Sequence, residues 1–190
     1  MNHYIAITLL LAFSFPAHAA DINLAASKIT INVEKSGLFS AFAHNHTIAA
    51  PLASGHLDVE KRTVELKFRS QEIKVLDPGI KESERADIQQ TMQSDKVLDS
   101  ARFPEISFVS TSVEVAGGSS ATKRYLVRGS LTLHGVTQPI ELPVAFSEGH
   151  YIGKVTLKQT DFGITPVKIA GGAVKVKDAI EVKFEIVPAK

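Results

Sequence analysis

The sequence predicts an all-β fold, an antiparallel β-barrel of about eight strands with one helix across it. Three observations lead to this prediction. Apolar and polar residues alternate through most of the chain from Lys28 onward, turn-forming residues separate the alternating segments, and one stretch has the composition of a helix. A period of two with one polar face is typical of half-buried antiparallel strands.

The strands are expected where the alternation is regular. In the first segment Ile29, Ile31 and Val33 share one face, while polar residues occupy the other. The same pattern recurs over residues 64–69, 106–109, 125–133, 140–146, 154–158 and 180–186. Turn signals at 117–120, 134–137, 148–150 and 170–172 separate these segments. Together with the stretch 46–59, they predict about eight strands.

One stretch departs from this pattern. Residues 81–98 are polar and rich in helix-forming types, and Ile88 and Met92 are spaced to share one helix face. Ser83 is a candidate N-cap, because a hydroxyl can accept a hydrogen bond from a free backbone N–H in the first turn. We therefore expect a helix over residues 83–95, lying across the barrel.

The first 19 residues have the features of a secretory signal peptide. Residues 4–15 form an apolar run, and Ala17 and Ala19 provide the small-x-small pattern that signal peptidase reads. The run is shorter than the about 20 apolar residues of a membrane-spanning helix. We expect cleavage after Ala19 and a single mature domain, residues 20–190, in the periplasm.

Composition excludes several classes of function. The 21 basic and 20 acidic residues are interspersed, with a formal net charge of +1, whereas a nucleic-acid binder needs a clustered basic surface. The chain has no cysteine, which removes disulfides, thiol catalysis and thiolate metal sites. It contains no nucleophile elbow, P-loop, dinucleotide fingerprint or zinc-protease motif. We expect no catalytic residue, no nucleic-acid partner and a binding protein rather than an enzyme.

The rows that we expect to face the barrel interior are aliphatic or Phe. An eight-stranded barrel is either filled by its own side chains or holds one small ligand. If it holds a ligand, an apolar one suits these rows, since a polar substrate needs convergent polar groups. The alternative is a filled core and a purely structural role. The candidate lining residues are Leu66, Phe68, Phe108, Leu131, Leu133, Phe146 and Phe184.

Two histidines form a second candidate site. His44 and His46 are two residues apart, so on a strand both point to the same side. One reading places them at the barrel mouth, where they donate hydrogen bonds to a ligand head group. The alternative is a Zn or Cu site in a metal-binding or redox accessory protein of the membrane electron-transfer system. That site would need further ligands from His56, Asp58 or His134, and we expect no metal.

Three motifs, in this order, resemble the YceI-like family of polyisoprenoid-binding periplasmic proteins. The first is a charged helix followed by Val97-Leu98-Asp99 and by RFPEISFVSTS at 102–112. The second is VRGSLTLHGVTQPI at 127–140, and the third is DFGI at 161–164. The resemblance runs from Ser27 to the C-terminus. The paired histidines depart from the better-known members, which indicates a His-x-His-containing subgroup.

The resemblance implies a lipocalin-like barrel with a long isoprenoid chain in its apolar interior. For function it implies a periplasmic carrier of an isoprenoid-type lipid, polyprenyl or quinone-like, with transient contact at the inner membrane. No cofactor other than such a lipid is expected, and the oligomeric state stays open.

Overall fold

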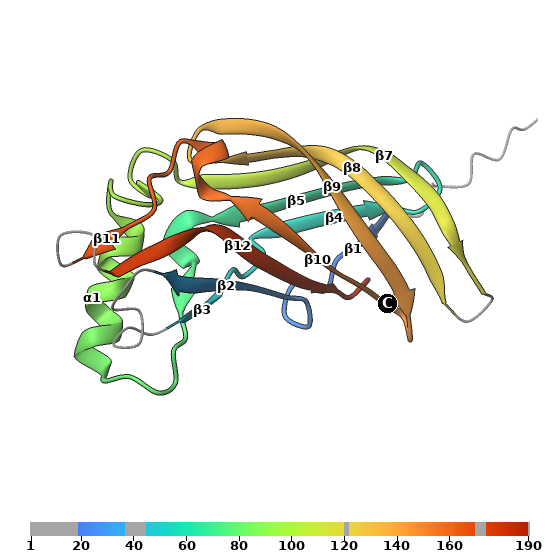
Figure 1. The fold of residues 1–190 in the computed structure, drawn as a ribbon. Helices are drawn as coiled ribbons and strands as arrows, with labels where there is room; N and C mark the ends of the chain where they lie inside the picture. The colour runs from blue at the N-terminus through green and yellow to red at the C-terminus, as the bar shows by residue number, and fades with distance from the viewer. Residues whose placement is uncertain (1–18, 37–44, 120–121, 170–173, 190) are drawn as a thin grey trace, which may run out of the picture.

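One antiparallel sheet curls around the interior of the molecule, and a helix lies at one end of it (Figure 1). The computed structural model describes residues 19–36, 45–119, 122–169 and 174–189. The strands are β1 (Ala19–Asp21), β2 (Lys28–Ser36), β3 (His46–Ala49), β4 (Ser54–Asp58), β5 (Thr63–Arg69), β6 (Lys74–Val75), β7 (Glu105–Gly118), β8 (Lys123–Leu133), β9 (Val136–Ser147), β10 (His150–Lys158), β11 (Lys168–Ile169) and β12 (Val174–Ile186). The helix α1 covers Glu82–Gln93, and two 3-10 turns cover Ser70–Glu72 and Gln159–Phe162.

The strand order confirms the predicted fold class. Neighbours in the sheet follow the path β1-β4-β5-β7-β8-β9-β10-β12-β2-β3-β6, with β11 beside β12. Eight of these strands have five or more residues, which matches the predicted number; β1, β3, β6 and β11 have two to four. In the described part of the chain no strand pairing joins β1 to β6, so the barrel is curled without a continuous ring of hydrogen bonds.

The hairpin of β8 and β9 shows how local sequence sets the register. The two strands pair from Leu133↔Val136 at the turn to Lys123↔Phe146 at the far end. The turn residues His134 and Gly135 have φ angles of 52° and 74°. Positive φ at both central residues gives a type I′ turn, whose twist matches that of the flanking strands. Inward rows on the two strands therefore stay opposite each other along the whole hairpin.

A β-bulge in β7 explains why its predicted strand was too short. The pairing of β7 with β8 shifts between Ser110 and Ser112. Before this point Ile106 and Phe108 line the interior, and after it Val113 and Val115 do. The extra residue moves the inward row from even to odd positions. The simple alternation therefore ends near Val109, although the strand continues to Gly118.

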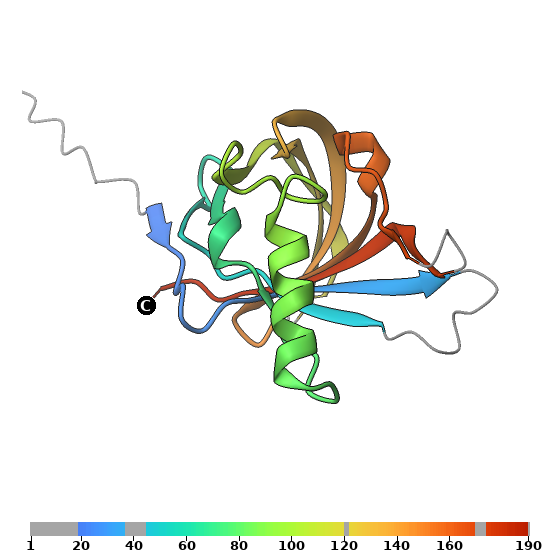
Figure 2. The same cartoon turned by 90° about the vertical axis from the view of Figure 1, so that its left-hand side faces the viewer.

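The helix α1 lies across one end of the barrel, as Figure 2 shows from that side. Met92 is buried and Ile88 packs against the core, so the predicted apolar face is confirmed. The predicted cap at Ser83 is wrong. The N-cap is Lys81, without a side-chain hydrogen bond, and Ser83 lies inside the first turn. Glu82 and Ser83 are both polar, so the sequence alone does not show at which of them the helix begins.

A glutamine side chain fastens α1 to the short strand β6. The Gln89 amide donates to the backbone oxygen of Ile73 at 2.8 Å. Its side-chain oxygen accepts the backbone N–H of Val75, also at 2.8 Å. The amide therefore supplies both hydrogen bonds that a neighbouring strand would supply, and it holds the helix against the sheet.

Gly129 on β8 leaves room for the outer edge of the Phe108 ring to approach the backbone of this strand. A Cβ at this position would stand 2.5 Å from the ring carbon Cζ of Phe108 and 2.5 Å from the backbone oxygen of Val109. We expect Gly129→Ala to lower the free energy of unfolding by about 1–3 kcal/mol, the usual cost of overpacking. Gly79→Ala is the control, because no atom lies within 4 Å of its Cβ position. Urea unfolding measures both, and equal stabilities would show that the Phe108 ring and the backbone at Val109 can both move aside.

Candidate binding cavity

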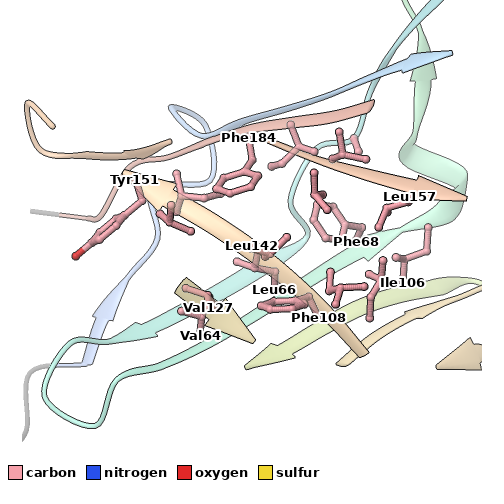
Figure 3. Close-up of a pocket in the computed structure, with 18 of the residues that line it drawn as sticks. Val64, Leu66, Phe68, Ile106, Phe108, Val127, Leu142, Tyr151, Leu157 and Phe184 are labelled. Atoms are coloured by element: carbon pink, nitrogen blue, oxygen red, sulfur yellow. The ribbon is translucent and has the colours of Figure 1, made fainter. Parts of the chain in front are cut away.

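The curled sheet encloses a cavity of about 720 Å³. Ligand sites in proteins have volumes of about 300–1,000 Å³. Its walls are inward-facing side chains from β2, β5, β7, β8, β9, β10 and β12, nearly all of them aliphatic or aromatic (Figure 3). The interior is therefore not filled by the protein's own side chains, in contrast to the alternative of a solid core.

Six of the seven residues predicted to line the interior do so: Leu66, Phe68, Phe108, Leu131, Leu133 and Phe184. The seventh, Phe146, is not among the lining residues, and its ring packs against Tyr151 with centroids 4.6 Å apart. The walls also contain the β2 row of Ile29, Ile31 and Val33, which the same alternation places inward. A ligand-binding role for these residues stays a prediction.

One end of the cavity, here called the helix end, is covered by α1 and the segment after it. Met92, Val97 and Leu98 line the cavity at this end. Near it the Asp77 carboxylate, whose side chain is 4% exposed, lies 2.6 Å from the Nδ1 of His46. Asp77 also accepts the backbone N–H of Thr47 at 2.7 Å. This network fastens the chain that leads into α1 to strand β3.

The structure separates His46 from the residues proposed to complete a metal site. His46 pairs with Asp77 and is not among the cavity-lining residues. His44 lies outside the described residues. The other candidates have different partners: His56 lies 3.7 Å from Asp21, Asp58 binds Lys61, and the Nδ1 of His134 lies 3.3 Å from the Phe162 oxygen. Within the described ranges, no group of three or more His, Cys, Asp or Glu side chains has the arrangement of a metal site.

The opposite end of the cavity, here called the open end, reaches solvent. Val59 and Val115 line the cavity and are still 58% and 59% exposed. Figure 3 shows Tyr151 at one end of the lining, with its hydroxyl pointing away from the apolar side chains. Burial raises the pKa of this hydroxyl, and Tyr125 beside it raises it further. Arg62 and Lys123 also belong to the lining.

A single carboxylate, Asp58, is found among the lining residues. Its side chain is 2% exposed. It accepts the backbone N–H of Lys61 at 2.8 Å, and the Lys61 ammonium lies 3.3 Å away. The backbone hydrogen bond from Lys61 lowers the pKa of Asp58, so the carboxylate stays charged and engaged in its own turn. The cations Arg62 and Lys123 therefore have no carboxylate of the lining available to them.

Comparison with known proteins gives the family. The sequence model of the YceI-like domain matches residues 19–187. This chain belongs to the YceI-like family. Among curated relatives, the UPF0312 protein of Pseudomonas syringae pv. tomato is 41% identical over 83 residues, covering 38% of this YceI-like chain and 41% of the relative. The chain thus spans less than half the length of the curated relatives it matches.

Two solved structures share the fold. The crystal structure of Burkholderia cenocepacia BcnA has a TM-score of 0.63 at 20% identity and covers 90% of the YceI-like chain and 100% of its own. The polyisoprenoid binding domain from Saccharophagus degradans has a TM-score of 0.61 at 16% identity, with coverages of 89% and 97%. In the part of the chain that the structure describes, no helix is long and apolar enough to span a membrane.

Proposed function

We propose that this YceI-like protein binds and carries an apolar isoprenoid-type lipid, polyprenyl or quinone-like, inside its barrel. The observation that carries the proposal is the cavity of about 720 Å³ with its almost entirely apolar walls. The description of the Saccharophagus degradans structure as a polyisoprenoid binding domain supports the choice of ligand class. The walls lack the convergent polar groups that a polar substrate needs.

The energetics of an apolar tail favour a carrier. Removing a tail from water gains about 0.8 kcal/mol per methylene. Over a long tail this sum would exceed about 18–21 kcal/mol, the practical limit of non-covalent affinity. The tail is, however, already in an apolar environment in a membrane. Exchange between bilayer and barrel is therefore close to neutral for the tail, and the protein can both take up and release its ligand.

The volume of the cavity limits how much of a tail it holds. A cavity of about 720 Å³ accommodates roughly two dozen groups of the size of a water molecule or a methylene, at about 30 Å³ each. A tail of about four or five isoprene units fits inside at this density. The remainder of a longer tail would leave through the open end.

We propose that this binding takes place in the periplasm. Residues 1–19 act as an export signal, and the mature protein exchanges its lipid during transient contact with the inner membrane. It catalyses no reaction. Intact-mass measurement on exported protein is expected to show a chain that lacks its first 19 residues.

Native mass spectrometry of protein purified from the periplasm tests the binding. We expect adducts whose mass matches an isoprenoid lipid and which disappear after extraction with organic solvent. Returning a C20 prenol to the extracted protein is expected to raise its thermal midpoint, because a ligand that binds only the folded state stabilises it. A protein that carries no adduct and shows no shift with the prenol would overturn the proposed function.

A further inference from the structure

Three hairpins of the sheet turn at the open end, on the side of the molecule away from α1 (Figure 1). The last strand pairs before these turns are Asp58↔Thr63 of β4 and β5, Gly118↔Lys123 of β7 and β8, and Ser147↔His150 of β9 and β10. Together these strand ends form the rim of the cavity. The surface of the rim is therefore what another molecule meets when it approaches the cavity.

Apolar side chains on this rim are exposed to solvent. Val59, between β4 and β5, and Val115 on β7 both line the cavity where it opens. They are also the two most exposed of the large apolar side chains in the described ranges. Exposed apolar groups that lie together at a binding cavity are typical of a contact surface. Something apolar is therefore expected to cover the rim when the protein works.

Two cations lie beside these valines. Arg62 belongs to the same turn as Val59, and Lys123 pairs with Gly118 near the end of β7. Both line the cavity, and neither side chain has a hydrogen bond or an ion pair within the part of the chain that the structure describes. Exposed valines flanked by free cations suit a partner with an apolar interior and a negatively charged surface. An anionic lipid bilayer has these two properties.

The carboxylates at this end do not neutralise the cations of the lining. Asp58 is engaged by the backbone and the ammonium group of its own turn. Glu114 forms an ion pair with Arg128 on the outer face of the sheet. Glu60 and Glu148 lie in the turns but are not among the residues that line the cavity. Positive charge therefore prevails where the cavity opens.

We infer that the open end docks on the surface of an anionic lipid bilayer. Val59 and Val115 enter the apolar layer, and Arg62 and Lys123 lie at the negatively charged surface. The cavity then opens directly onto the bilayer, so that an apolar tail passes between the two without crossing water. The inference rests on the proposed function, because this orientation serves a protein that exchanges an apolar ligand with a membrane.

The contact is expected to be reversible. Each lysine or arginine near an anionic bilayer raises the affinity about fivefold, and salt screens this contribution. Two valines bury much less apolar area than the acyl chain of a lipid anchor, and even a single such chain gives only reversible binding. The protein can therefore arrive at the membrane, exchange its ligand and leave.

A second cationic surface, at the other end of the barrel, provides a control. Lys168 on β11 pairs directly with Lys175 on β12, and both side chains are exposed. Neither residue lines the cavity inside the barrel. A bilayer bound to this surface would leave the open end in water. Replacing these two lysines removes as much charge as replacing Arg62 and Lys123.

Flotation of the delipidated protein with vesicles tests the docking. We expect the wild type to bind vesicles of phosphatidylethanolamine and phosphatidylglycerol about tenfold more tightly than vesicles of phosphatidylcholine. Arg62→Gln combined with Lys123→Gln is expected to remove most of this preference. Val59→Asp combined with Val115→Asp is expected to weaken binding to both kinds of vesicle about tenfold or more, because the apolar contact is lost.

Val109→Asp is the control for the valines, since Val109 is exposed on β7 and does not line the cavity. Lys168→Gln combined with Lys175→Gln is the control for the charges. Both control proteins are expected to bind vesicles as the wild type does. Losses as large as those of the rim variants, or rim variants that bind normally, would overturn the inference. So would a wild type that binds no vesicles and forms a dimer which Val115→Asp separates, because a second copy would then cover the rim.

The rate of ligand transfer gives an independent readout. If the open end meets the bilayer directly, protein loaded with a C20 prenol should deliver it to acceptor vesicles at a rate that rises with vesicle concentration. A rate independent of vesicle concentration would mean that the prenol is first released into water, which contradicts the inference alone. A wild type that binds vesicles but takes up no prenol would instead contradict the proposed function.

Discussion

Replacing Leu142 with Trp is expected to abolish lipid binding and to leave the stability of the delipidated protein almost unchanged. Leu142 points into the middle of the cavity from β9 (Figure 3). If the cavity is empty in the delipidated protein, the indole occupies space that the lipid tail would use. In a filled core the same change would cost about 1–3 kcal/mol through overpacking. Binding is measured by native mass spectrometry with a C20 prenol, and stability by urea unfolding.

The matched control for this prediction is Leu126→Trp. Leu126 pairs with Pro143, next to Leu142, but its side chain is on the outer face of the wall. The same substitution there is expected to keep wild-type binding. If the Leu142→Trp protein retains lipid and loses stability, Leu142 belongs to a packed core. That result would contradict its place in the wall of the cavity.

Asp77→Ala is expected to destabilise the helix end of the barrel. Asp77 is buried and holds both the Nδ1 of His46 and the backbone N–H of Thr47. Each polar group that is left buried without a partner costs about 1–3 kcal/mol. Chemical unfolding should therefore show a substantial loss, and hydrogen exchange should quicken in β6 and α1 before the rest of the sheet. These two elements depend most directly on the contacts of Asp77 with His46 and Thr47.

The exposed Asp87 on α1 provides the comparison. Asp87→Ala makes the same chemical change where the structure gives the side chain no hydrogen bond or ion pair, so its effect should stay within about 0.5 kcal/mol. Combining Asp77→Ala with His46→Ala should cost less than the sum of the two single changes, because they act on one interaction. Full additivity would mean that the two side chains do not interact.

The sequence predicted the wall of the cavity and could not predict the space inside it. The alternation around Leu66 and Leu131 assigns inward faces correctly, because one-sided burial is what produces alternation. A filled barrel and a hollow one both need apolar inward rows. The difference depends on the radius of the curled sheet, which follows from strand stagger and appears nowhere in the pattern. Phe146 shows the same limit, since its row is inward but it lies beside the cavity, against Tyr151.

Other features were missed because they are short or long-range. The strands β1, β3, β6 and β11, with two to four residues each, carry too little alternation to be seen. The contact of His46 with Asp77 joins positions 31 apart, and no local pattern connects them. The inward direction of Lys123, in contrast, follows from the phase of Tyr125 and Val127. The predicted strand began at Tyr125 and so did not include Lys123, although the observed strand does.

The cavity is closed by the pairing of β2 with β12, so it cannot form before both strands are present. These strands come from opposite ends of the chain, and the side-chain hydrogen bond from Asn32 to Glu181 joins positions 149 apart. Contacts over such separations make folding slow, because the loop-closure entropy must be overcome first. A chain that ended before Val174 would contain the other seven long strands and still lack one wall of the cavity. The wall of the cavity is therefore complete only when nearly the whole chain has been made.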